Sequence, residues 1–188
     1  KNAGLNPKNG EVGALFFLGD KQANQLAEAA LEENTDSNKL KSIIKDNQPV
    51  DIALFGRMVA DDPSLNEDAS CQVAHAISTH AIQTEFDYFT AVDDLAPDDN
   101  AGAGMIGTVE YNSSTLYRYA NVAIHEFYRK LNGNIDEVTD ALKLFVKAFS
   151  NSLPTGKINT FANQTVPQAI VVSLRSDRPV NLISAFEK

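Results

Sequence analysis

The chain has 188 residues, of which 43% are hydrophobic, enough to bury the core of one domain that carries an appendage. A formal net charge of −9 counts against a broad phosphate-binding surface, because affinity for nucleic acid comes from Lys and Arg. No apolar run approaches the roughly 18 residues that a membrane span requires, and a single cysteine, Cys71, excludes an internal disulfide framework. We therefore expect no membrane partner, a cytoplasmic location, and a Cys71 that is a small buried hydrophobe.

The two ends of the sequence suggest a piece of a larger protein. Residues 1–10 are polar and rich in Asn, without an initial Met. The chain stops on Lys188, just after an apolar NLISAF stretch.

The first part of the chain predicts two helices followed by a strand. The apolar residues 13–18 fit a strand or the start of a buried helix. Asp20 is a plausible N-cap for a helix over residues 21–33, and residues 39–45 fit a second short helix. The sequence VDIALFGRM at residues 50–58 is interpreted as a mostly buried strand, followed by a polar connection that contains Pro63.

The middle of the chain is acidic and lacks cations. From Met58 to Tyr117 there is no Lys or Arg, but there are eleven Asp or Glu residues. Residues 71–79 are ambiguous, although their β-branched content favours a strand, and residues 115–122 are another strand candidate. Because Arg57 and Arg118 flank the acidic segment, we interpret it as an arm that projects from a sheet whose base carries the cations.

The clearest helix follows this arm. Asn134 and Glu137 form a capping box, and Pro154 marks the far end of the helix. Between them the apolar residues are spaced by four, three and four, namely Val138, Leu142, Phe145 and Phe149. Residues 169–174 (AIVVSL) then predict a short buried strand.

Three patterns suggest chemistry but have simpler explanations. GAGMIG, from Gly102 to Gly107, matches a dinucleotide fingerprint but precedes the strand-like TVEY instead of opening a helix, which favours a plain loop. The spacing of His75 and His80 does not suit a metal pair on a strand or a helix. The doublets Asp61–Asp62, Asp93–Asp94 and Asp98–Asp99 are more typical of turns and caps than of magnesium sites. A metal-dependent nuclease or hydrolase using His75, Asp93 and Asp94 is kept as the alternative function.

Two further patterns leave a nucleic-acid role open. In a strand, Tyr117 and Tyr119 would share one face, where aromatics can stack on bases, and Arg118 on the other face could pair with phosphate. Arg57 at a strand end could clamp phosphate, and Met58 could act as an apolar wedge between bases. Half-buried tyrosines, a core methionine and solvated arginines are the alternatives.

Several longer motifs occur together in one order: DIALFGRM, AHAISTH, FDYFTAVDDL, GTVEYNSSTLYRYANV and NLISAFEK. Together they resemble the CasC (Cse-type) backbone subunit of the type I-E Cascade complex, the CRISPR RNA surveillance assembly. The similarity covers residues 50–188.

The resemblance implies an α+β fold. Residues 50–188 would form an RRM-like, ferredoxin-type palm that lacks its first strand and helix, with a projecting thumb hairpin at about residues 81–115. Residues 1–49 would be the remnant of a helical subdomain.

The resemblance also implies a non-catalytic function. Subunits of this family form a filament along the CRISPR guide RNA, contact other copies and other Cascade subunits, and meet target DNA through the guide. No cofactor, metal or catalytic residue is implied. The expected RNA-binding residues are Arg57, Met58, Tyr88, Phe89, Thr90, Ala91, Arg118 and Lys157.

Overall fold

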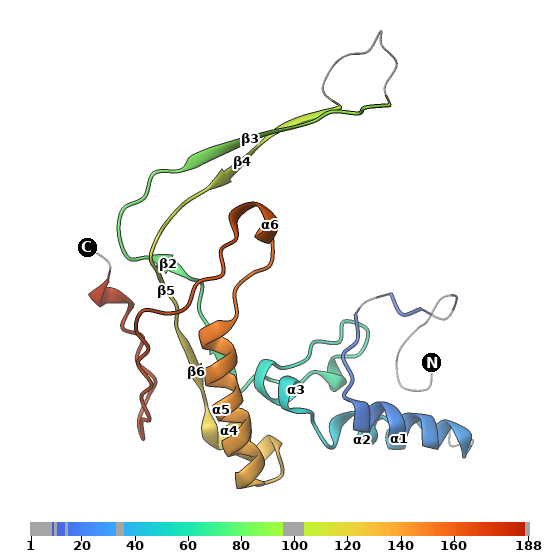
Figure 1. Ribbon diagram of the computed structural model, residues 1–188. Coiled ribbons are helices and arrows are strands. Elements are labelled where there is room, and N and C mark those ends of the chain that lie inside the picture. Colours follow the sequence, from blue (N-terminus) through green and yellow to red (C-terminus); the bar gives the residue numbers. More distant parts are fainter. Residues whose placement is uncertain (1–8, 10, 14, 33–35, 96–103, 187–188) are drawn as a thin grey trace. The chain divides into compact units, whose positions relative to one another are not determined.

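The computed structural model describes residues 9, 11–13, 15–32, 36–95 and 104–186 (Figure 1). The fold is α+β, as expected, and the chain divides into two compact units. The first unit contains Lys1–Gln72 and Ala120–Asp177, and the second contains Val73–Tyr119 and Arg178–Lys188.

The helices α1 (Asp20–Leu31) and α2 (Ser37–Lys45) confirm the two predicted N-terminal helices. The N-cap of α1 is Gly19, so Asp20 is the first helical residue instead of the cap. The described residues of the 13–18 run form neither a strand nor a helix. A small core joins this region to the 3-10 helix η1 (Pro63–Leu65) and consists of Ile44, Val59 and Leu65, with Phe16 and Leu26 packed against it.

The predicted strand at residues 50–58 is wrong, because Val50–Phe55 is a helix, α3. Pro49 is its N-cap residue, and Gly56 ends it with a φ of 78°. The helix buries Ile52, Ala53 and Leu54 in succession. A short apolar run bounded by Pro and Gly satisfies either periodicity, so the flanking residues were the better indicator.

The main core of the first unit lies between α3, α4 (Ile124–Lys130) and α5 (Ile135–Asn151). Of the predicted capping box of α5, the N-cap bond is confirmed, since Asn134 Oδ1 accepts from the Glu137 backbone N–H at 3.2 Å. The Glu137 carboxylate in turn accepts from the side-chain amide of Asn134 at 3.3 Å. Cys71 is buried in this core, as predicted, and desolvation raises the pKa of its thiol. The buried core residues are Ala53, Leu54, Cys71, Phe127, Leu131, Val138 and Ala141.

The described strands form three two-stranded sheets: β1 (Cys71–Val73) with β6 (Ala120–Val122), β2 (Ile77–Ser78) with β5 (Leu116–Tyr117), and β3 (Glu85–Ala91) with β4 (Met105–Tyr111). The two predicted strands at residues 71–79 and 115–122 are therefore each divided into two short strands. In the second unit β3 and β4 form a long antiparallel hairpin. The loop predicted for GAGMIG is wrong for Met105, Ile106 and Gly107, which belong to β4, whereas Gly102 and Ala103 lie outside the described residues.

The predicted buried strand at residues 169–174 is also wrong. This segment has no regular secondary structure, and its apolar side chains are exposed, with Val171 80% and Leu174 84% accessible. Burial of a strand requires a neighbouring strand, and the described residues pair none with this segment. The C-terminal part of the first unit otherwise contains only the short helix α6 (Ile158–Phe161) among its described residues after α5. None of the described helices is long and apolar enough to cross a membrane.

Candidate nucleic-acid interface

Met58 is exposed in the segment that follows α3. Its side chain is 78% accessible, whereas its neighbours Arg57 and Val59 are each only 4% accessible. An exposed methionine between two buried residues offers a flexible apolar side chain to a ligand. The structure therefore leaves the Met58 side chain accessible.

Arg57 is buried, in contrast to the phosphate clamp expected from the sequence. Its Nε donates to the Leu65 carbonyl at 3.1 Å, Nη1 to the Phe17 carbonyl at 3.4 Å, and Nη2 to the Ile44 carbonyl at 3.2 Å. The guanidinium also lies 5.6 Å from the centre of the Phe16 ring. Burial lowers the pKa of Arg57, partly offset by the charge of Glu67. These contacts give Arg57 a structural role within the first unit.

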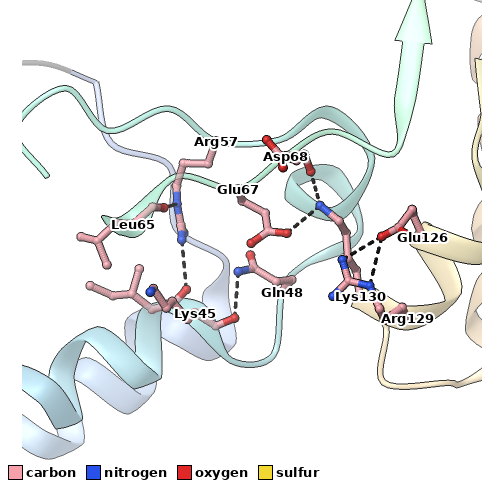
Figure 2. A network of polar contacts seen from close by, with 10 residues as sticks. Lys45, Gln48, Arg57, Leu65, Glu67, Asp68, Glu126, Arg129 and Lys130 are labelled. Atoms are coloured by element: carbon pink, nitrogen blue, oxygen red, sulfur yellow. Dashed lines mark hydrogen bonds and ion pairs between the residues drawn. The ribbon is translucent and has the colours of Figure 1, made fainter. Parts of the chain in front are cut away.

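Glu67 ties the Met58 segment to α4. The backbones of Arg57 and Glu67 exchange two hydrogen bonds, of 2.9 and 2.8 Å. The Glu67 carboxylate in turn accepts from Lys130 Nζ at 2.6 Å, and Lys130 also donates to the Asp68 carbonyl (Figure 2). Gly56 permits the close approach, because a Cβ there would lie 2.6 Å from the Glu67 carbonyl oxygen.

The β3–β4 hairpin of the second unit has two faces of different character. Alternation places Phe86, Tyr88 and Thr90 on one face, where their antiparallel partners are Glu110, Thr108 and Ile106. All six of these residues are exposed, with Tyr88 62% accessible. We call this the open face; Glu110 is its single charged residue, since the other five side chains are aromatic, aliphatic or hydroxylic.

The opposite face is acidic, with Asp87 and Phe89 half-buried at its centre and Glu85 exposed at its end. It carries Glu85, Asp87 and Phe89, and the Phe89 ring lies across Gly107, its partner on β4. Tyr111 donates to Glu85 at 3.0 Å, and the hydrogen bond and charge of Glu85 raise the pKa of Tyr111. The four expected thumb residues are therefore divided, with Tyr88 and Thr90 on the open face and Phe89 and Ala91 on the acidic one.

Tyr117 contacts the end of the chain. Its hydroxyl donates to Asn181 Oδ1 at 2.8 Å and accepts from the Leu182 backbone N–H at 3.1 Å. Its ring centre lies 4.9 Å from that of Phe186. Tyr117 is therefore used for packing instead of offering a stacking surface. Arg118 is half-buried and lies after β5, between the two short strands.

Lys157, the remaining expected contact, is in the first unit. It is exposed at the N-cap of α6 and has a left-handed backbone conformation with a φ of 57°.

The residues of the alternative hydrolase are not gathered into a site. Among the described residues, no group of three or more His, Cys, Asp or Glu side chains is positioned to hold a metal ion. Asp93 accepts from the Leu95 backbone N–H at 3.0 Å, which is a local turn contact. His80 is exposed, contacting the Ala81 carbonyl and the Thr115 N–H, and His75 is exposed as well. The Asp98–Asp99 doublet lies outside the described residues.

Residues 1–188 match the family described as CT1975-like protein over their whole length. The chain belongs to this family. It is also similar to a solved chain described as "CRISPR RNA-guided surveillance complex, pre-nicking", with a TM-score of 0.84, 30% identity and 98% of this chain covered. A second, described as "CRISPR RNA-guided surveillance complex", gives a TM-score of 0.64 and 31% identity over 88% of this chain. No curated protein gave a significant match.

The relationship to CRISPR surveillance proteins drawn from the sequence motifs is therefore confirmed. The chain spans little more than half of the solved chains that it matches, 55% of the first and 58% of the second.

Sequence reasoning missed three residues of this region. Glu67 and Lys130 are 63 positions apart in the sequence, so no local pattern indicates that they pair and hold the Met58 segment. Phe86 extends the open face beyond Tyr88, and the alternation of aromatic residues in FDYF could have shown it.

Proposed function

We propose that this chain is part of a non-catalytic scaffold subunit that binds guide RNA in a Cascade-type CRISPR surveillance complex. The similarity to a chain of an RNA-guided surveillance complex over 98% of this chain, with a TM-score of 0.84, carries the proposal. In this account the subunit has an RRM-like palm and repeats along the guide RNA in the cytoplasm, and target DNA pairs with the guide.

Two surfaces of this chain are suited to the task. Met58 is an exposed apolar side chain that can separate adjacent bases, and the open face of the hairpin offers Phe86 and Tyr88 for stacking. The acidic face has two carboxylates, Glu85 and Asp87, which repel phosphate. The proposal therefore assigns RNA contact to Tyr88 and Thr90, and gives Phe89 and Ala91 a role in hairpin packing.

The cationic contribution of this chain is small. Its net charge is −9, and no Lys or Arg lies between Met58 and Tyr117. Arg118 and Lys157 are the proposed phosphate contacts, and binding otherwise depends on shape and stacking. A protein that grips RNA in this way has a shallow dependence of affinity on salt.

The test is to incubate the complete protein with guide RNA, with and without Mg²⁺ or Mn²⁺. We expect the RNA to remain intact in every sample and to be protected from added ribonuclease. Cleavage that requires the metal ion and is lost in Asp93→Ala, but not in the matched control Asp61→Ala, would establish the hydrolase alternative instead.

A further inference from the structure

The Met58 segment is held rigidly on both sides. Met58 is 78% accessible, whereas Arg57 and Val59 on either side of it are each 4% accessible. Val59 packs in the small core with Ile44 and Leu65. The Val59 backbone N–H also donates to Asn66 Oδ1 at 2.7 Å.

The Arg57 side chain joins three segments that are distant in sequence. Its nitrogens donate to carbonyls of Phe17, of Ile44 near the end of α2, and of Leu65 in η1. The Ile44 carbonyl also accepts from the fully buried Gln22 side chain at 2.7 Å. If Arg57 turned to a phosphate, the buried Leu65 and Ile44 carbonyls would lose this donor, which is costly for groups removed from water.

Glu67, the backbone partner of Arg57, is held by a separate set of contacts. Glu67 exchanges backbone hydrogen bonds with Arg57, and its carboxylate pairs with the nearly buried Lys130 of α4. The Arg57 side chain therefore connects this backbone pair to α2, and the Glu67 side chain connects it to α4.

We infer that Arg57 is a positioning residue for Met58 and not a phosphate ligand, an inference that rests on the proposed function. Displacing a base costs a few kcal/mol of unstacking free energy. A methionine side chain has several rotatable bonds, so on a mobile backbone it would move aside instead of displacing the base. The Arg57–Glu67 bridge supplies the rigid support that such a wedge requires.

The experiment uses the complete protein assembled on guide RNA, with chemical probing of the RNA and the salt dependence of assembly as two separate measurements. Arg57→Lys, Arg57→Gln and Met58→Ala are compared with wild type. We expect wild type to show regularly spaced hyper-reactive nucleotides that fade in Met58→Ala. In both Arg57 variants these nucleotides should fade as well, while the slope of log affinity against log salt stays unchanged.

A double variant of Arg57 and Met58 distinguishes a positioning role of Arg57 from a general loss of folding. The double variant Arg57→Lys with Met58→Ala should be no worse than Met58→Ala alone in the probing pattern, because both changes remove the same wedge. If Arg57→Gln does not fold, Glu67→Gln provides the second route, since it weakens the Lys130 anchor and keeps the backbone bridge. It should reduce the hyper-reactivity at an unchanged salt slope.

Two outcomes distinguish failure of the inference from failure of the proposed function. A salt slope that becomes shallower by about 0.7 in Arg57→Gln, which removes the charge that Arg57→Lys keeps, would show a phosphate contact and overturn the positioning role. Persistent hyper-reactivity in the folded Arg57 variants would also overturn it. Uniform reactivity in wild type would instead contradict the wedge itself, whatever the Arg57 variants do.

Discussion

Lys130 and Glu67 form an ion pair of 2.6 Å between Nζ and Oε1, with side chains that are 4% and 23% accessible. Arg129, the residue before Lys130, forms an ion pair of 2.7 Å with Glu126, but these two side chains are 69% and 43% accessible to solvent. Two neighbouring cations of α4 therefore make ion pairs of similar length in very different surroundings.

This contrast predicts different consequences for stability. Lys130→Met should lower the free energy of unfolding by about 2–3 kcal/mol, because Glu67 and the Asp68 carbonyl lose a charged donor in a mostly buried place. Arg129→Met is the matched control and should leave stability nearly unchanged, since solvent screens an exposed pair. Urea denaturation measures the free energy of unfolding of both variants. Equal losses in the two would contradict the difference expected between the buried and the exposed pair.

Asn134 caps the longest helix of the chain. Asn134→Ala should lower the free energy of unfolding by about 1 kcal/mol, because the Glu137 N–H loses its acceptor. Asn134→Asp keeps an acceptor at the same place and should restore most of the loss. Thermal unfolding measures both variants. Equal stability of Asn134→Ala and wild type would mean that this cap contributes nothing.

The Tyr117 hydroxyl holds the C-terminal residues of the second unit. Tyr117→Phe removes its contacts with Asn181 and Leu182 but keeps the ring beside Phe186. We expect a loss of about 1 kcal/mol of local stability, visible as faster hydrogen exchange of the Leu182 amide. Amides of α5, in the other unit, should exchange at the wild-type rate. Unchanged exchange at Leu182 would show that the hydroxyl does not hold this segment.

Asp62 reports on the contact between α2 and η1. Hydrogen bonds from Lys41 and the Ser64 N–H lower its pKa from 3.8 to about 2. Because the folded-state pKa is the lower one, the pair stabilises the fold above pH 3.8, and this contribution is lost as the pH falls through about 2. In Lys41→Met the pKa should rise toward 3.8. A carboxyl ¹³C NMR titration measures it, and an unchanged pKa would exclude Lys41 as the main cause.

The two faces of the hairpin should respond differently to substitution. Tyr88→Ala should weaken RNA binding by about 1–3 kcal/mol, as expected for one lost stacking contact, with no change in hairpin structure. Phe89→Ala should act through the fold, because the Phe89 ring covers Gly107. Binding titrations with circular dichroism separate the effects. A greater loss of RNA affinity in a well-folded Phe89→Ala than in Tyr88→Ala would reverse the assignment of the faces.

The helix α5 could be predicted from sequence because its signals are local. A cap residue and a repeating apolar face lie within one segment, from Asn134 to Phe149. The segment at residues 50–58 failed because a short apolar run satisfies both periodicities, although Pro49 and Gly56 marked the ends of a helix.

The candidate site was predictable only in part. Met58 and Tyr88 were identified from the family resemblance, and the structure leaves both exposed. The burial of Arg57 could not be foreseen, because its three acceptors come from Phe17, Ile44 and Leu65, which no local pattern brings together. A cation beside a proposed RNA contact resembles a phosphate ligand until its surroundings are known.

Contact between guide RNA and these two surfaces can be measured by ultraviolet crosslinking of guide RNA to the complete protein in its purified complex, with the crosslinked peptides identified by mass spectrometry. We expect RNA to copurify and crosslinks to form at Met58 and at Phe86 or Tyr88 of the open face, and not at Asp87 or Phe89. Absence of bound RNA, or crosslinks confined to the acidic face and to other segments, would contradict a guide-RNA scaffold that uses these two surfaces.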